Sequence, residues 1–314
     1  MIYVDSDTIA KAAAIGDWID AMEDAFRDTA KGKIEVPKRT QLNYGENTLV
    51  LMPCFGEHFF CTKLVSAHPG NLKKKKPVIT GTVILNDGET GEPLAAFDGS
   101  KLTAMRTAGV GSVGIKYLAP EDAETLGVIG LGIQGFHQAL FACLQRPIRE
   151  LRILDRTSRI AYRFRERFRD YYPHVEVIPC RNARELCEAS EIVVTATASK
   201  NPIVPGKYRW WEGKTVIGIG SYQPEMREFP DEIFTDLDRL FVDTLHGLSE
   251  AGDLVEPVNN HLIRKEQIFP ISDLITGRVS AGGTTRFFKS VGMAAFDLYG
   301  AKLVYGKIPW NSAG

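Results

Sequence analysis

Two rhythms of hydrophobic and polar residues divide the 314-residue chain. Near its start, Trp18, Met22 and Phe26 recur at the spacing of one helix face, which predicts a helix over 17–30. Farther along, the rhythm changes to short apolar runs separated by glycine, proline and an Asn-Asp-Gly turn signal. The connections are too short for crossover helices, so these runs should pair mainly as antiparallel strands. The predicted strands cover 1–4, 39–44, 48–53, 58–67, 78–86 and 93–97.

From residue 125 onward, short apolar runs alternate with helical stretches, which is the pattern of a doubly wound parallel sheet. A long helix over 101–118 precedes this region, and Pro120 marks the boundary. A last helix, 293–305, should cross back and pack on the first domain. We therefore expect an α/β protein. The predicted strands cover 125–129, 151–155, 174–178, 191–197, 214–219 and 239–242, and the helices between them cover about 136–146, 157–170, 182–188 and 229–237.

Three glycines join the first parallel strand to its helix in a G-x-G-x-x-G pattern. Gly130 permits a tight turn, Gly132 lets the backbone approach a pyrophosphate, and Gly135 lets helix and strand pack closely. The free N–H groups of the helix start would hold the phosphates. Asp155 lies 23 residues after Gly132, where an acid can accept the ribose hydroxyls of adenosine. A tight turn without a ligand is the alternative, but the strand, helix and acid together favour a nicotinamide dinucleotide.

Composition and charge describe an ordinary globular protein, with 44% hydrophobic and 25% charged residues. The net charge of −1 lacks the basic excess that nucleic-acid and membrane-surface binding need. No apolar run is long enough for a membrane span, and the first residues, MIYVDSDTIAK, do not resemble a signal peptide. The five cysteines form no C-x-x-C pair, and no His/Cys cluster has metal-ligand spacing. We therefore expect a cytoplasmic protein with reduced thiols and no bound metal.

Three basic residues of the first domain could hold a substrate carboxylate, for which arginine offers a bidentate grip. Lys63 lies inside the apolar run FFCTKLVSA, where a lysine is costly unless paired or functional; a solvated edge-strand lysine is the alternative. Arg106 lies in LTAMRTAG, on a helix surface of small residues that a ligand can approach closely. Arg39 begins a strand, and a surface arginine at the strand end is the alternative. The run Lys73–Lys76 is more simply a solvated loop.

Seven stretches of the sequence carry a family resemblance that extends over nearly the whole chain. They are KLVSAHPGN (63–71), GTVILNDGETGEPLAAFDGSKLTAMRTAG (81–109), GVIGLGIQG (127–135), VVTATAS (193–199), GIGSYQPEMRE (218–228), LFVD (240–243) and FKSVGMAAFD (288–297). The combination of the RTA segment with G-x-G-x-Q-G is the most specific of these signals. Together the stretches resemble the ornithine cyclodeaminase/mu-crystallin family.

This resemblance implies a Rossmann domain at 120–289, inserted in a mainly antiparallel α+β domain of residues 1–119 that 290–314 complete. The α+β domain would bind the substrate and form a homodimer through its β-sheet. Members of the family use NAD(P). They include ornithine and lysine cyclodeaminases, alanine dehydrogenases, cyclic ketimine reductases and mu-crystallins.

The resemblance also implies roles for single residues. Arg39, Lys63 and Arg106 match the basic residues that hold the substrate carboxylate and flank the reacting carbon. Lys63 matches the proton donor or acceptor, and a lysine with a lowered pKa in a partly dry site can deliver a proton. Ser290 and Val291 match positions near the nicotinamide. The residues expected to contact the cofactor are Gly130, Gly132, Ile133, Gln134, Gly135, Asp155, Arg156, Thr157, Thr197, Gly218, Ile219, Ser290 and Val291.

The chain departs from the cyclodeaminase pattern at one position. Ornithine cyclodeaminases carry an aspartate in a G-D-x-P-G-K segment, and this acid binds the distal amine of the substrate. Here Tyr222 stands at the aligned position, in G-S-Y-Q-P-E-M-R-E, and tyrosine cannot replace a carboxylate as the partner of an ammonium group. The segment looks more like the imine-reductase branch, in which Tyr222 would line the ring pocket or donate a hydrogen bond. A structural tyrosine at the strand end is the alternative.

The signals for the nucleotide conflict. Asp155 favours NADH because an acid repels a 2′-phosphate. Arg156 and Thr157 follow it, and Arg159 is close, which is typical of a 2′-phosphate site. Mu-crystallin-like members use NADPH and have Asn before Arg-Thr. We favour NADH, with use of both nucleotides as the alternative.

The residues and the resemblance together indicate a reductase of cyclic α-imino acids. The substrate would be Δ1-pyrroline-2-carboxylate or Δ1-piperideine-2-carboxylate, and the product L-proline or L-pipecolate. Lys63, Arg106 and Tyr222 should converge near the nicotinamide. The alternatives are an ornithine cyclodeaminase, an alanine or other amino-acid dehydrogenase, and a mu-crystallin-like cofactor-binding protein without turnover. Intact Lys63 and Arg106 count against the last, because a purely structural role needs neither.

Overall fold

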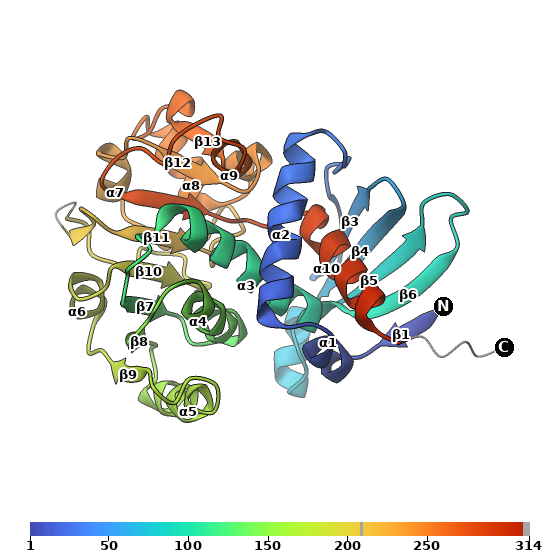
Figure 1. Ribbon diagram of the computed structural model, residues 1–314, viewed down its shortest axis with the longest axis horizontal. Coiled ribbons are helices and arrows are strands. Elements are labelled where there is room, and N and C mark those ends of the chain that lie inside the picture. Colours follow the sequence, from blue (N-terminus) through green and yellow to red (C-terminus); the bar gives the residue numbers. More distant parts are fainter. Residues whose placement is uncertain (208–209, 310–314) are drawn as a thin grey trace. The chain divides into compact units, whose positions relative to one another are not determined.

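The structure is a computed structural model that describes residues 1–207 and 210–309 (Figure 1). The chain forms two compact units: Met1–Gly109 with Met293–Gly314, and Val110–Gly292. The boundaries expected from the sequence lie after residues 119 and 289. Each unit is built around its own β-sheet.

The first unit contains a six-stranded sheet in the order β1-β6-β5-β4-β3-β2. β1 runs parallel to β6, and the other neighbouring pairs are antiparallel. The mainly antiparallel sheet predicted from the short connections is therefore confirmed. The strands are β1 (Ile2–Val4), β2 (Thr40–Tyr44), β3 (Asn47–Phe55), β4 (Phe59–Ala67), β5 (Ile79–Asp87) and β6 (Pro93–Asp98).

The pleat of this sheet decides which side chains are buried. In β3 and β4, Met52 pairs with Lys63 and Cys54 pairs with Cys61, and all four side chains are buried. Because side chains alternate along a strand, these four share one face of the sheet. Their neighbours on the opposite face, such as Leu64, stay partly exposed. Lys63 therefore points to the covered face rather than to solvent.

Helices of the first unit cover that buried face. The C-terminal helix α10 (Ala294–Lys307) packs on β3, β4 and β5 and against α2 (Ile15–Ala30). The two helices lie side by side in Figure 1, and α10 lies in front of the strands. α1 (Ser6–Ala12) is capped by Asp5, whose side chain accepts the backbone N–H of Thr8 over 2.8 Å. The long helix α3 (Gly99–Leu118) follows β6.

The second unit contains an eight-stranded sheet in the order β13-β12-β14-β11-β10-β7-β8-β9. Its neighbouring strands pair in parallel, which confirms the predicted doubly wound sheet. The strands are β7 (Thr125–Ile129), β8 (Glu150–Leu154), β9 (Glu176–Pro179), β10 (Ile192–Thr195), β11 (Thr215–Gly218), β12 (Leu240–Val242), β13 (Ile268–Pro270) and β14 (Arg286–Lys289).

The helices of the second unit differ from the prediction mainly after β11. The helix expected over 229–237 is only the four-residue α7, and α8, α9, β13 and β14 were not predicted at all. β14 has four residues, three of them buried, and a run this short carries no periodicity by which to recognise it. The helices are α4 (Ile133–Gln145), α5 (Ser158–Arg169), α6 (Ala183–Glu188), α7 (Glu232–Thr235), α8 (Gly252–Asn259) and α9 (Ile271–Ile275).

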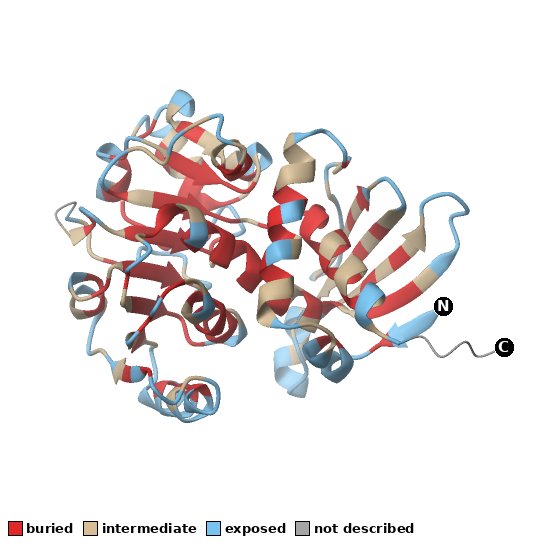
Figure 2. Cartoon of the chain, viewed as in Figure 1, coloured by how far each residue is buried: buried red, intermediate tan, exposed pale blue. Residues whose placement is uncertain are grey.

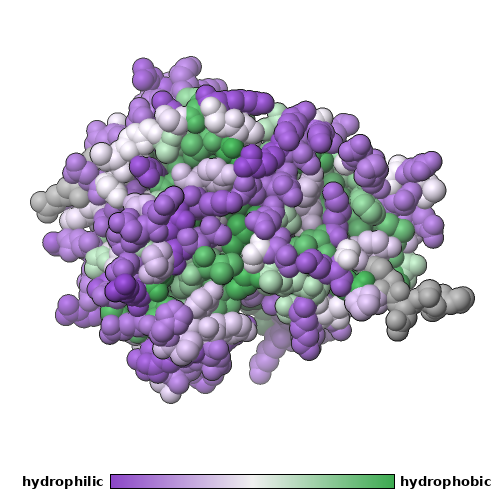
Figure 3. All heavy atoms as spheres, viewed as in Figure 1, coloured by the Kyte–Doolittle hydropathy of each residue, from purple (hydrophilic) through white to green (hydrophobic). Residues whose placement is uncertain are grey.

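Burial follows this organisation. Figure 2 shows buried residues along the strands of the parallel sheet and along α3. Hydrophilic side chains predominate on the face shown in Figure 3, and smaller hydrophobic areas interrupt them. In the part of the chain that the structure describes, no helix is long and apolar enough to cross a membrane.

Candidate functional site

The three glycines after β7 have different surroundings. Gly130 has a φ of +92°, and a Cβ there would lie 2.6 Å from the carbonyl oxygen of Ala196. At Gly135 a Cβ would lie 1.9 Å from the carbonyl oxygen of Gly130. Nothing lies within 4 Å of a Cβ built on Gly132. Packing therefore requires the first and third glycines, whereas the second borders space that a ligand can occupy.

The N-terminus of α4 has the properties of a phosphate site. Gly132 is its N-cap and offers no side chain to the first N–H groups of the helix. Ile133 is 65% exposed, and Oε1 of Gln134 is buried without a hydrogen-bond partner among the described residues. The unsatisfied N–H groups and the helix dipole favour an anion at this end.

Asp155 follows β8 directly and is attached to the glycine turn. The backbone N–H of Leu131 donates to Oδ2 of Asp155 over 2.9 Å. Within residues 1–207 and 210–309 this is the only hydrogen bond of the carboxylate, so Oδ1 can accept a ribose hydroxyl. Arg156 and Thr157 follow on the exposed surface, and Thr157 is the N-cap of α5 without a side-chain hydrogen bond.

A buried glutamate connects the loops after β10 and β11. The hydroxyl of Thr195 donates to Glu228 Oε2 over 2.8 Å, and the N–H of Gly220 donates to the same oxygen over 2.8 Å. The N–H and the hydroxyl of Thr197 donate to Oε1 over 2.7 and 2.9 Å. Burial raises the pKa of Glu228, while Lys289 and these hydrogen bonds oppose the rise. The carboxylate thus fixes Thr197 and the backbone after Gly218.

A second buried acid organises the segment after β14. Asp243 Oδ2 accepts the Ser290 hydroxyl over 2.8 Å and the N–H groups of Val291 and Gly292 over 2.9 and 2.6 Å. Burial raises the pKa of Asp243, and these hydrogen bonds act against the rise. The N–H of Ser290 also donates to the carbonyl of Gly218 over 2.9 Å.

The sheet thus brings most of the predicted cofactor residues to one edge. Gly130, Asp155, Thr197, Gly218 and Ser290 stand at or just beyond the carboxyl ends of β7, β8, β10, β11 and β14. These five strands are parallel and lie consecutively in the sheet, as β14-β11-β10-β7-β8. The reversal of strand order falls between β7 and β10, the place where dinucleotides bind in such sheets.

The first unit holds a buried cluster of one acid and two cations. Lys63 Nζ and Arg106 Nε each lie 3.2 Å from Asp297 Oδ1. The side chains of Lys63 and Arg106 are 7% exposed, and that of Asp297 is fully buried. We call these three residues the Lys63–Arg106–Asp297 cluster. They come from β4, α3 and α10, so the C-terminal helix supplies the acid to cations that precede the second unit in sequence.

The electrostatics of this cluster make Lys63 a group that titrates near neutral pH. Burial lowers the pKa of Lys63 to about 8; the Asp297 carboxylate opposes this change, and the Arg106 guanidinium adds to it. A lysine with such a pKa exchanges a proton under ordinary conditions, which an exposed lysine does not. Cys61 lies on the same strand, and burial raises the pKa of its thiol well above the usual value.

The other two predicted substrate residues lie outside the Lys63–Arg106–Asp297 cluster: Arg39 is in the first unit and Tyr222 is in the second. Arg39 directly precedes β2 and is half-buried; continuing the register by one residue sets it opposite Met52, which pairs with Lys63. Tyr222 belongs to the second unit, is 37% exposed, and burial raises the pKa of its hydroxyl. The structure therefore brings Lys63 and Arg106 together through Asp297, and it describes Tyr222 in the other unit.

Sequence reasoning missed three acids of these sites. Asp297 is the only charge in the apolar stretch AAFDLYGA, and the argument that singled out Lys63 would have found it. Asp243 ends the run LFVD and follows a buried strand. Glu228 lies in PEMREFPDE, where other charges surround it and nothing marks it as buried.

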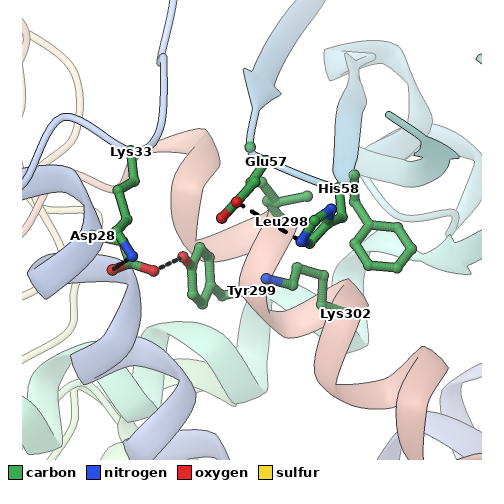
Figure 4. Close-up of a pocket in the computed structure, with 9 residues that line it drawn as sticks. Asp28, Lys33, Glu57, His58, Leu298, Tyr299 and Lys302 are labelled. Carbon is green, nitrogen blue, oxygen red and sulfur yellow. Dashed lines mark hydrogen bonds and ion pairs between the residues drawn. The ribbon is translucent and has the colours of Figure 1, made fainter. Parts of the chain in front are cut away.

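A small pocket lies between the C-terminal end of α2, the β3–β4 connection and α10. Its volume is about 60 Å³, and it is lined by Asp28, Lys33, Gly56, Glu57, His58, Phe59, Leu298, Tyr299 and Lys302 (Figure 4). The Tyr299 hydroxyl donates to Asp28 Oδ2 over 2.5 Å, and Lys302 Nζ lies 4.4 Å from the centre of the Tyr299 ring. None of the predicted site residues lines this pocket.

Comparison with known proteins points to one family. The model of the ornithine cyclodeaminase/mu-crystallin family matches residues 3–311. A Delta(1)-pyrroline-2-carboxylate reductase of Bacillus cereus is 33% identical over 302 residues, which cover 92% of this chain and 91% of the relative.

Solved structures agree with this match. The Delta(1)-pyrroline-2-carboxylate reductase of Thermococcus litoralis, in complex with NADH and L-proline, superposes with a TM-score of 0.90 at 31% identity, covering 98% of this chain and 97% of that one. An archaeal alanine dehydrogenase dimer with bound NAD gives a TM-score of 0.89 at 28% identity, covering 98% of this chain and 95% of that one.

Proposed function

Because the chain belongs to the ornithine cyclodeaminase/mu-crystallin family, we propose that it is an NAD(P)H-dependent reductase of cyclic α-imino acids. The substrate is Δ1-pyrroline-2-carboxylate or its six-membered homologue Δ1-piperideine-2-carboxylate, and the product is L-proline or L-pipecolate. The observation that carries this proposal is the buried Lys63–Arg106–Asp297 cluster, in which a lysine of lowered pKa lies beside an arginine. Such a pair can bind a carboxylate and move a proton.

The residues of the second unit fit a nicotinamide dinucleotide. The open space at Gly132 and the uncapped start of α4 suit a pyrophosphate, and the Asp155 carboxylate suits a ribose. Thr197 and Ser290, held by Glu228 and Asp243, stand at the same sheet edge. When bound, the reduced nicotinamide supplies the hydride that the imine carbon accepts.

The first unit would supply binding and proton transfer. The two terminal nitrogens of Arg106 form a planar fork that matches a carboxylate, and Arg39 adds a further cation just before β2. Lys63, protonated below its pKa of about 8, donates its proton to the ring nitrogen as the imine becomes an amine. Tyr222 would be a further substrate-binding residue.

Asp155 makes NADH the favoured nucleotide. Its carboxylate, fixed by Leu131, would stand beside the adenosine ribose and repel a 2′-phosphate. Arg156 and the N-cap Thr157 lie next to it on the exposed surface and would attract that phosphate. We propose that NADH is preferred and that NADPH is used less well.

The face of the six-stranded sheet opposite to the one that α10 covers supports a homodimer. Leu42 and Tyr44, both 50% exposed, share this face with Leu49, the pairing partner of Leu42. Apolar side chains on an exposed sheet face favour association. A Leu42→Lys variant should shift the mass measured by light scattering toward a monomer. Leu72→Lys, at a 72% exposed leucine outside the sheet, should leave the mass unchanged.

The test of the proposed reaction is the oxidation of NADH or NADPH on adding each cyclic imine. Turnover of either imine is the expected result. Absence of turnover with both imines, in protein that still binds NADH, would contradict the proposal. Pyruvate with ammonia tests the alanine dehydrogenase alternative that the archaeal structure favours. L-Ornithine with NAD⁺ tests cyclodeamination, which Tyr222 disfavours because it offers no carboxylate to the distal amine.

A further inference from the structure

We propose that Asp297 is the positioning residue of this reductase: through a single oxygen it orients Lys63 and Arg106 and neutralises one of the two buried cations. The inference rests on the proposed function and deepens it. Its basis is the position of Asp297 Oδ1, which is 3.2 Å from both Lys63 Nζ and Arg106 Nε. Two cations and one anion leave the cluster with one net positive charge, the complement of one substrate carboxylate.

The contacts of Arg106 show how the orientation works. Asp297 occupies the Nε side of the guanidinium, and the Phe296 ring lies 5.9 Å from Cζ. Both residues belong to α10, so one helix supports the guanidinium with a charge and with a ring. Within residues 1–207 and 210–309, only Nε of Arg106 is hydrogen-bonded, and the terminal nitrogens keep their donors for a ligand.

Lys63 is left in a similar state. Its ammonium group has three donors, and in the described chain one of them is used, by Asp297. The remaining donors are available to a substrate carboxylate or to the ring nitrogen. Without the anion, Lys63 and Arg106 would be two like charges whose side chains are only 7% exposed, and repulsion would separate them.

The second oxygen of Asp297 argues for a functional role rather than a stabilising one. Oδ2 is buried and has no hydrogen-bond partner among the described residues. An unsatisfied buried carboxylate oxygen lowers stability, and well-packed apolar side chains in place of a buried ion group are often more stable. The unsatisfied carboxylate oxygen of Asp297 thus lies beside Lys63 and Arg106, the two residues proposed to bind the substrate.

The groups that face Lys63 decide how its proton responds to the loss of this acid. They are Asp297 on α10, Arg106 on α3 and Cys61 on β4 itself. Asp297 alone among the three carries a negative charge at neutral pH, because the Cys61 thiol has a raised pKa. Removing the charge of Asp297 should therefore lower the pKa of Lys63 below its value of about 8.

The decisive variant is Asp297→Asn, which keeps the size of the side chain and removes its charge. The alkaline limb of the profile of kcat/KM against pH for imine reduction should move down by about one pH unit or more. At neutral pH, kcat should fall roughly 10- to 100-fold. NADH affinity, measured by fluorescence, should stay within about two-fold of wild type, because the cofactor residues belong to the second unit. If the alkaline limb of Asp297→Asn stays at the wild-type pH and its kcat stays within about two-fold of wild type, the proposal is overturned.

Two further variants separate positioning from general support of α10. Asp297→Glu keeps the charge but displaces it, so the limb should stay near that of wild type while kcat falls. Tyr299→Phe is the matched control on the same helix: it breaks the hydrogen bond to Asp28 and leaves the cluster intact. Its kcat and pH limb should equal those of wild type. A loss in Tyr299→Phe as large as that in Asp297→Asn would assign the effect to helix packing.

A variant that fails to fold still gives an answer. If Asp297→Asn unfolds because two buried cations lose their anion, then Lys63→Met combined with Asp297→Asn should fold again, since one cation and one anion leave together. Circular dichroism and thermal unfolding measure this rescue without any substrate. An unfolded double variant would overturn the charge-compensating role of Asp297. This folding test does not depend on the proposed reaction. If the proposed reaction is wrong, the wild-type protein will be folded but will not reduce either imine.

Discussion

Leu131 donates its backbone N–H to Oδ2 of Asp155 over 2.9 Å. This bond joins the glycine turn after β7 to the end of the neighbouring parallel strand β8. It holds a negative charge beside the N-terminus of α4, in the position where adenosine ribose hydroxyls are bound in folds of this class. Asp155 therefore has two tasks, as a structural acceptor and as a fixed charge, and the two can be separated by substitution.

The Asp155→Asn variant should change the choice of nucleotide without loss of structure. The asparagine oxygen can still accept the Leu131 N–H, but the charge that repels a 2′-phosphate is gone. The ratio of kcat/KM for NADPH to that for NADH should rise roughly ten-fold, about 1.4 kcal/mol. Arg156→Gln is the matched control and should lower the same ratio. A ratio within about two-fold of wild type in Asp155→Asn would contradict the role of the charge.

The pH dependence of the reaction should follow Lys63. Its folded pKa of about 8 is below the usual value of 10.5, so the proton-donating form is complete well below pH 8 and is lost as pH rises through that value. The kcat/KM for imine reduction should then fall about ten-fold per pH unit above the limb. In the reverse direction, amine oxidation should rise through the same limb, because neutral Lys63 accepts the proton.

The control for this profile is Lys63→Arg, which keeps a cation but does not titrate in this range. Its reductive activity should be low and should show no limb near pH 8. An identical limb in wild type and Lys63→Arg would assign the titration to another group, such as the imine nitrogen of the substrate.

Local pattern was enough to predict the elements that hold the cofactor residues, since apolar strands, glycines and helices alternate regularly from 125 to 155. It failed for β14, whose four residues pair between β11 and β12 although β12 comes 44 residues earlier in the chain, counted from Val242 to Arg286. Only tertiary pairing defines such a strand. Its position matters, because Ser290 follows it directly.

The candidate site was predictable wherever a charge stood in apolar surroundings. Lys63 was found in this way, whereas Arg106 was found because it lies on a helix surface of small residues that a ligand can approach closely. Asp297 also stands in apolar surroundings, but its pairing could not be predicted, because it is separated by 234 residues from Lys63 and by 191 from Arg106, and sequence spacing does not show which buried charges meet. Glu228 could not be recognised at all, since its burial depends on packing of the loops after β10 and β11.

Glu228 should control cofactor affinity through the loops it connects. In Glu228→Gln, an amide NH₂ group, which cannot accept a hydrogen bond, replaces one carboxylate oxygen. The replaced oxygen is either the one that accepts from Thr195 and Gly220 or the one that accepts from Thr197. Loss of one or two buried hydrogen bonds costs about 1–3 kcal/mol. The Kd for NADH should rise roughly ten-fold, and the thermal midpoint should fall by several degrees. Glu225→Gln, an exposed residue of the same loop, should change neither quantity. Unaltered NADH affinity in Glu228→Gln would show that these loops do not need the carboxylate.

The three glycines of the turn should respond differently to alanine. Gly132 has no atom within 4 Å of a built Cβ and a φ of −75°, so Gly132→Ala should fold with an unchanged thermal midpoint. The added methyl would instead meet the pyrophosphate, and the Kd for NADH should rise at least roughly 100-fold. At Gly135 the Cβ would lie 1.9 Å from the Gly130 carbonyl oxygen, so Gly135→Ala should lower the thermal midpoint as well. Calorimetry of both variants with and without NADH measures the contrast. If folded Gly132→Ala binds NADH with normal affinity, the pyrophosphate does not bind at this turn.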